Sequence, residues 1–107
     1  MKDSAKAVTP PHGRFSLGSL AATPKVLALL ERLGVSPLTL VLRHVTGDFG
    51  ELDAADVAAN EEAIEHGLRV FSAYAVNDPH DTAQVNRVWI ITEADRSVTT
   101  VLTPAEY

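Results

Sequence analysis

Two side chains of this 107-residue chain have the chemistry for acid–base catalysis on a phosphate. His44 stands near the end of an expected helix, where it titrates near neutral pH and can act as general base or acid, with Asp48 available to orient its ring. Arg96 stands in a turn beside several hydroxyl side chains, and a guanidinium in that setting can hold a phosphate or carboxylate. With Thr99 or Tyr74 assisting, these residues indicate a metal-independent ribonuclease.

A structural role explains the same two residues, and we favour it for both. A histidine in the last turn of a helix interacts favourably with the final carbonyl groups. Arg96 has Glu93 and Asp95 beside it as ion-pair partners, and the neighbouring threonines suit a solvated hairpin. Asp48 and Glu93 are therefore candidate binding residues rather than members of a complete catalytic set.

Further polar side chains are expected to converge if one face of the predicted sheet packs under the helix that carries His44. Ser72 and Tyr74 share one strand face, and Thr92 should lie opposite Thr99 in the last hairpin. The expected members are His44, Asn60, Ser72, Tyr74, and either Thr92 or Thr99. They would form either a polar pocket or a buried hydrogen-bond network that fixes packing, and the sequence leaves both open.

The elements that must position these residues are three helices followed by strands. Cap residues and apolar spacing predict helices bounded by Thr23–Gly34, Ser36–Gly47 and Asp53–Gly67. On the third helix, Asn60 lies on the apolar face, where an amide needs hydrogen-bond partners.

The strands are predicted from alternating apolar residues. Leu68–Val76 carries apolar groups on both faces, as expected of an inner strand, and Asn77–Asn86 reads as a long polar loop. Arg87–Tyr107 has the pattern of a β-hairpin, and Arg14–Leu20 is either a short edge strand or an ordered coil. The predicted fold is α+β, with three helices packed on a three- to four-stranded antiparallel β-meander. Residues 1–13 are expected to be a flexible tail and residues 14–107 a single domain.

Composition narrows the possible functions. The chain has no cysteine, its four histidines lack metal-ligand spacing, and neither a metal nor a cofactor is expected. No apolar run could cross a bilayer and no secretory signal is visible, which predicts a cytoplasmic protein with no membrane contact. The net charge is −5, and Thr46–His66 holds seven acidic residues without a lysine or arginine. Such a segment repels a phosphate backbone, so DNA is disfavoured as a partner. RNA remains an alternative only if basic side chains converge elsewhere on the protein.

Four segments carry a resemblance to a known family: Arg43–Gly50, Ser72–Tyr74, Trp89–Thr100 and Leu102–Tyr107. They resemble small proteobacterial proteins that are often encoded on plasmids and integrative elements, and the resemblance extends from about Phe15 onward. Some members carry a label that links them to type I restriction subunits. This chain is too short for a methyltransferase and has no glycine-rich cofactor loop, so the restriction label does not carry over to it and the resemblance implies no particular activity. The order of elements is also similar to that of barnase/RelE-like ribonucleases, but many such toxins are basic and this chain is acidic.

Three functions are consistent with these observations. The first is a non-enzymatic accessory protein of a mobile genetic element, which binds a protein partner through its acidic surface or its polar hairpin. The second is a ribonuclease with His44 as general base or acid and Arg96 holding the phosphate, assisted by Thr99 or Tyr74. The third is an anti-defence protein whose acidic residues mimic nucleic acid.

Overall fold

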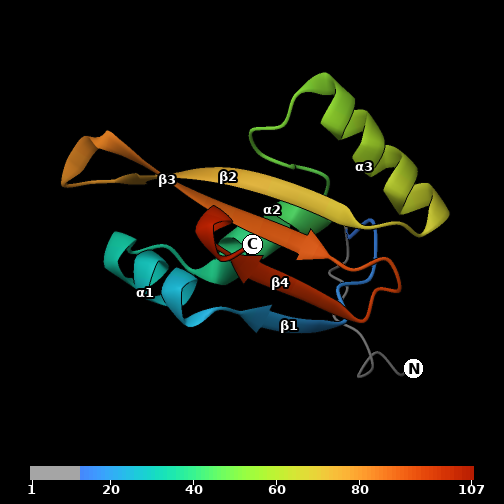
Figure 1. The fold of residues 1–107 in the computed structure, drawn as a ribbon, viewed down its shortest axis with the longest axis horizontal. Helices are drawn as coiled ribbons and strands as arrows, with labels where there is room; N and C mark the ends of the chain where they lie inside the picture. The colour runs from blue at the N-terminus through green and yellow to red at the C-terminus, as the bar shows by residue number, and fades with distance from the viewer. Residues whose placement is uncertain (1–12) are drawn as a thin grey trace.

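The computed structural model describes residues 13–107, which form one four-stranded sheet with three α-helices and a short 3₁₀ helix (Figure 1). In chain order the elements are β1 (Ser19–Ala22), α1 (Pro24–Leu33), α2 (Pro37–Val45), α3 (Ala54–His66), β2 (Val70–Asp78), β3 (Asp81–Thr92), β4 (Val98–Leu102) and η2 (Pro104–Glu106). The predicted tail lies outside the described residues except for Gly13. Within residues 13–107, no helix has the length and apolar character needed to span a membrane.

The strands are arranged in the order β1-β4-β3-β2, and the sheet is mixed. The pairs β2–β3 and β3–β4 are antiparallel, whereas β1 runs parallel to β4 with Ser19 opposite Val98. The α+β class is therefore confirmed, and the purely antiparallel meander is wrong. Three helices and a hairpin separate β1 from β4 along the chain, so no tight turn forces these two strands to be antiparallel.

The β2–β3 hairpin is longer than the sequence indicated, and the loop predicted for Asn77–Asn86 is wrong. Both strands continue to a tight turn at Pro79 and His80, past a register shift between Asn77 and Asp78. Proline lies in the turn, where no ladder hydrogen bond is lost, and an Asp78 carboxylate oxygen accepts the His80 N–H at 2.8 Å. Arg32 of α1 also pairs with Asp78 at 2.9 Å and so ties the hairpin end to that helix.

β2 was predicted to be an inner strand, but it forms an edge of the sheet that other parts of the chain cover. The Ala73 N–H donates to the Phe49 carbonyl at 3.1 Å, and the Ala73 carbonyl accepts the Glu51 N–H at 2.7 Å. Gly50 lies between them and bridges to Ala73. This loop takes the place of a neighbouring strand. β2 carries apolar groups on both faces, as an inner strand does, and the prediction therefore placed it inside the sheet rather than at its edge.

The helices begin and end close to the predicted cap residues. Thr23 accepts the Val26 N–H at 3.3 Å at the start of α1, and Asp53 accepts the Asp56 N–H at 2.8 Å at the start of α3. Ser36 makes no side-chain capping bond, and α2 ends at Val45, before the predicted stop at Gly47. Local capping thus fixes the first and third helices more firmly than the second.

The core lies between one face of the sheet and the helices α1 and α2. Val26 and Leu30 of α1, Val45 of α2 and Val88 of β3 are fully buried there. Helix α3 lies beside β2 at the edge of the sheet, whereas the sequence suggested that all three helices cover one face (Figure 1). The opposite face is turned toward the viewer in Figure 1, and among residues 13–107 the helical element that lies over it is η2.

Gly50→Ala should destabilise the fold strongly, because a Cβ at this position would lie 2.0 Å from the Ala73 carbonyl oxygen, at a φ of 77°. Gly34→Ala is the matched control, since Gly34 has a φ of 73° and nothing within 4 Å of an added Cβ. We expect a loss of about 1 kcal/mol at Gly34 from the left-handed backbone alone, and at least twice that at Gly50. Urea unfolding measures both, and equal losses would contradict the close approach of the loop to β2.

Candidate functional site

His44 is the centre of a chain of hydrogen bonds in the core. Its Nδ1 lies 2.6 Å from the Ser72 hydroxyl, and its Nε2 lies 2.9 Å from the Thr92 hydroxyl. Thr92 contacts Thr99 at 2.7 Å, and Thr99 donates to the Leu17 carbonyl at 2.8 Å. The four side chains in this hydrogen-bonded series are fully buried. The structure thus brings together four of the predicted residues, His44, Ser72, Thr92 and Thr99.

The Leu17 carbonyl fixes the direction of every bond in this chain, because a carbonyl can only accept. Thr99 uses its proton on Leu17, so it must accept from Thr92, and Thr92 in turn accepts from Nε2 of His44. His44 is therefore the Nε2–H tautomer, and its Nδ1 accepts the Ser72 proton. A neutral ring satisfies all of these contacts.

Burial also holds the ring neutral. Desolvation, with a smaller contribution from the positive charge of Arg96, lowers the pKa of His44 from 6.5 to about 3. Asp48, which was predicted to orient the ring, pairs with Arg43 at 2.7 Å instead. Since both ring nitrogens are occupied and the side chain has no exposed surface, this arrangement has the features of a packing network rather than of an open acid–base site.

Arg96 serves as a cap for backbone carbonyl groups. Its guanidinium donates to the carbonyls of Leu68 at 2.6 Å and Ala63 at 2.9 Å, and more weakly to two carbonyls of its own turn. The Phe15 ring contacts both predicted catalytic groups, with its centroid 5.6 Å from the Arg96 guanidinium carbon and 5.2 Å from the His44 ring. A phosphate would have to displace these contacts to reach either residue.

The other predicted site residues also have partners within the protein. The Tyr74 hydroxyl donates to the Asp48 carbonyl at 2.6 Å, and burial raises the pKa of this hydroxyl. The Asn60 amide donates to the Phe71 carbonyl at 2.6 Å and accepts the Phe71 N–H at 3.0 Å, which attaches α3 to the edge of β2. Glu93 pairs with Arg69 at 3.1 Å on the uncovered face of the sheet. Asn60, Tyr74 and Glu93 thus do not line a common pocket with His44.

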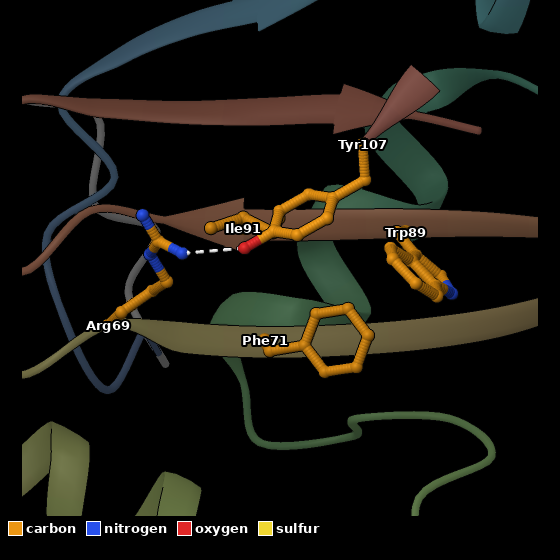
Figure 2. Close-up of a pocket in the computed structure, with 5 residues that line it drawn as sticks. All are labelled: Arg69, Phe71, Trp89, Ile91 and Tyr107. Carbon is orange, nitrogen blue, oxygen red and sulfur yellow. Dashed lines mark hydrogen bonds between the residues drawn. The ribbon is translucent and has the colours of Figure 1, made fainter. Parts of the chain in front are cut away.

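An aromatic pocket that the sequence analysis missed lies on this uncovered face (Figure 2). It encloses about 240 Å³ and is lined by Arg69, Phe71, Trp89, Ile91 and Tyr107. We call the apolar part of this lining, Phe71, Trp89, Ile91 and Tyr107, the aromatic face. Phe71, Trp89 and Ile91 alternate with the core residues of β2 and β3, so the period-two pattern held a signal for them, but it could not show which side of the sheet is covered.

The rings of the aromatic face meet edge to face. The Phe71 and Trp89 centroids lie 5.0 Å apart at 87°, and those of Trp89 and Tyr107 lie 5.7 Å apart at 67°. Arg69 donates to the Tyr107 hydroxyl at 2.9 Å and also pairs with Glu93, whose hydrogen bond raises the pKa of the guanidinium (Figure 2). The pocket therefore has apolar walls and one permanently charged end.

The turn that carries Tyr107 is held in place from two sides. A carboxylate oxygen of Glu106 accepts the Thr103 N–H at 3.0 Å and the Thr103 hydroxyl at 2.8 Å, which closes a capping box on η2. The same oxygen accepts the Thr23 hydroxyl at 2.7 Å, at the start of α1. Tyr107 thus returns over β3 at a defined position, although 71% of its surface is exposed.

A second group of titratable side chains lies on α3. Glu62, Glu65 and His66 place their ligand atoms within 4.8 Å of one another, and all three are exposed. Glu61 on the same helix pairs with Arg14 at the rim of a hollow of about 430 Å³. Solvated acidic side chains of this kind are common on helix surfaces, so the cluster alone does not define a metal site.

Comparisons with models of protein families, with curated proteins and with solved structures found no match for this chain. The class that the structure itself defines is a small α+β protein with a mixed four-stranded sheet and one uncovered aromatic face.

Stability should fall as the pH is lowered through the range in which only the unfolded chain protonates His44. The folded pKa lies below the unfolded value, so the contribution of His44 is complete above pH 6.5 and is lost toward about pH 3. Between about pH 6 and pH 5 the free energy of unfolding should approach a slope of about 1.4 kcal/mol per pH unit. The carboxylates with lowered pKa values contribute below this window. Chemical denaturation across the window should show the slope in the wild type and its absence in His44→Leu, whereas a flat wild-type profile would contradict neutral burial.

Arg96→Lys tests whether the guanidinium supports the fold. An ammonium cannot reach the separate carbonyls that Arg96 spans, so we expect a loss of about 1–3 kcal/mol in unfolding free energy. Arg43→Lys is the control, because Arg43 makes an exposed ion pair with Asp48 and lies over the Tyr74 ring, two contacts that an ammonium can also make, so stability should change by less than about 1 kcal/mol. An unchanged stability of Arg96→Lys would show that the side chain is not needed for packing.

Proposed function

We propose that this protein is a non-enzymatic binding protein and that the aromatic face is the surface that contacts a protein partner. The observation that carries this proposal is the gathering of Phe71, Trp89 and Tyr107 around an open pocket beside Arg69. Tryptophan, tyrosine and arginine are the residues most enriched where protein interfaces gain their binding energy. The family resemblance suggests that a mobile genetic element encodes the protein, and the sequence suggests that it is cytoplasmic. Such a protein would act as an accessory factor of that element.

The energetics of the aromatic face support this assignment. Large aromatic side chains bury about 150–250 Å² each when they are fully covered. Each Å² of apolar surface removed from water contributes roughly 25 cal/mol of favourable free energy. Trp89 and Phe71 are only partly buried and Tyr107 is mostly exposed, so a partner would still gain from covering them. Their edge-to-face contacts hold the rings in place, which reduces the entropy lost on binding.

The acidic segment supports the partner-binding and nucleic-acid-mimic alternatives less well. Three of its seven acidic residues pair with arginines, namely Asp48, Glu51 and Glu61. Asp53 accepts a backbone N–H as a helix cap. The remaining unpaired charge is a small part of the surface, which weakens any resemblance to a phosphate backbone.

The ribonuclease alternative also receives little support from the geometry. A general base must reach a substrate proton, directly or through one water molecule. Both nitrogens of His44 are bonded to buried hydroxyls, and Arg96 is bonded to carbonyls. Binding through the aromatic face requires no rearrangement of either residue.

Partner capture with matched variants tests the proposal. Phe71→Ser combined with Trp89→Ser, and separately Tyr107→Ser, should each lose a partner that the tagged wild type retains, because both changes remove apolar contact area. Leu38→Ser combined with Leu42→Ser is the control, since these α2 side chains are 58% and 49% exposed on a different surface. Chemical denaturation must show that each variant is folded.

Charge reversal separates the two candidate surfaces. Glu62→Lys combined with Glu65→Lys should leave capture unchanged if the aromatic face binds the partner. Loss of the partner in this variant, with retention in the aromatic variants, would move the binding site to α3 and contradict the proposal.

A further inference from the structure

Resting on the proposed binding function, we propose that the partner inserts an aromatic side chain into the pocket of the aromatic face and places a neighbouring carboxylate on Arg69. The partner would be a protein segment in which an aromatic residue stands next to an aspartate, a glutamate or a chain-terminal carboxylate. Each part of this ligand has a counterpart among the residues that line the pocket.

The walls of the pocket select an apolar, planar group. Phe71, Trp89 and Tyr107 present ring surfaces, and the buried Ile91 side chain lies beneath the Tyr107 ring (Figure 2). The cavity of about 240 Å³ is large enough for one aromatic side chain and too small for a folded element. Aromatic rings prefer offset or edge-to-face neighbours, which the present ring angles of 87° and 67° offer to a fourth ring.

The charged end of the pocket offers hydrogen-bond donors that have no acceptor among the described residues. A guanidinium carries five N–H groups, and Arg69 directs one to the Tyr107 hydroxyl and one to Glu93. The Tyr107 oxygen accepts from Arg69, so its own proton is available to a ligand. Donors from a guanidinium and a phenol at one end of an apolar pocket match a carboxylate.

The charge balance of this face fits one carboxylate better than a polyanion or a cation. The face carries two ion pairs, Arg69 with Glu93 and Arg87 with Glu51, so its local net charge is close to zero. The two carboxylates of this face would repel a phosphate backbone as strongly as the two arginines attract it. An ammonium would be repelled by the guanidinium that lines the pocket. A single ligand carboxylate can replace Glu93 as the ion-pair partner of Arg69. Glu93 is partly exposed, so its charge is not left buried without a partner.

Glu93 and the ligand thus compete for the same guanidinium. Glu93 holds Arg69 at 3.1 Å in the free protein, and both side chains are partly exposed, so the exchange needs no change in the backbone. Removal of the Glu93 charge should therefore strengthen ligand binding, which a merely apolar site would not show.

Three probes with one ring and different charges test the ligand class: 3-phenylpropionate, 3-phenylpropanamide and 3-phenylpropylammonium. Trp89 is the only tryptophan of the chain and lines the pocket, so its fluorescence reports binding to the full-length protein directly. We expect the carboxylate to bind about five- to tenfold more tightly than the amide, and the ammonium to bind most weakly. Equal affinities for the three probes would overturn the carboxylate assignment.

Variants of the charged end make the test specific. Arg69→Gln should reduce the affinity for 3-phenylpropionate to that for the amide, and Glu93→Gln should raise it several-fold. Arg43→Gln is the control, because Arg43 carries a similar exposed ion pair with Asp48 but does not line the pocket, and the affinity of this variant should match that of the wild type. An identical affinity in all three variants would also overturn the assignment.

An oligouridylate of eight nucleotides tests whether an RNA strand, with its bases and phosphates, fills the pocket instead of an aromatic and acidic protein segment. Tighter binding of this probe than of 3-phenylpropionate would overturn the inference in favour of RNA. Failure of every probe to bind would overturn it as well, and the partner-capture experiment would then decide separately whether the aromatic face binds a protein by other contacts.

Discussion

The structure depends on the unbroken direction of the hydrogen bonds that run from Ser72 through His44, Thr92 and Thr99 to the Leu17 carbonyl. These groups come from α2, from three separate strands or their flanks, and from the segment before β1. A buried polar group without a partner costs about 1–3 kcal/mol, so removal of any member leaves its neighbours unsatisfied. The network therefore ties the parallel strand β1, through Leu17, to the same core that holds the helices and the hairpin.

Features that are set by neighbouring residues could be predicted from the sequence. The caps at Thr23 and Asp53 and the pairing of Thr92 with Thr99 were confirmed, because a cap or a short turn is determined within a few residues. The direction of β1 and the covered edge of β2 depend on contacts between segments that are far apart in the sequence. The Gly50 loop covers that edge without any strand pattern of its own, so the alternation in β2 suggested a central position.

The candidate site shows the same division. The convergence of Ser72, Thr92 and Thr99 on His44 was predictable from their shared face, but the coverage of that cluster was not. Phe15 and Leu17 close the cluster from a segment in which the sequence could not distinguish strand from coil. The aromatic face was missed for a related reason, because alternation separates two sides of a strand without stating which side helices will cover.

Each side of the sheet holds an exception to the usual distribution of polar and apolar groups. Hydroxyls and a neutral imidazole lie inside, where directed hydrogen bonds satisfy them, while three aromatic rings lie on the side that none of the three α-helices of residues 13–107 covers. The core residues Val26, Leu30 and Val88 pack without any help from the outer rings, so the fold does not require Phe71, Trp89 or Tyr107 to be covered. Apolar area that folding leaves exposed is still available to a second binding event, and its free energy is gained only when a partner removes it from water. The separation of the core from the aromatic face would thus let the sheet act as a rigid support for the proposed binding, while the stability of the fold is set on the opposite side.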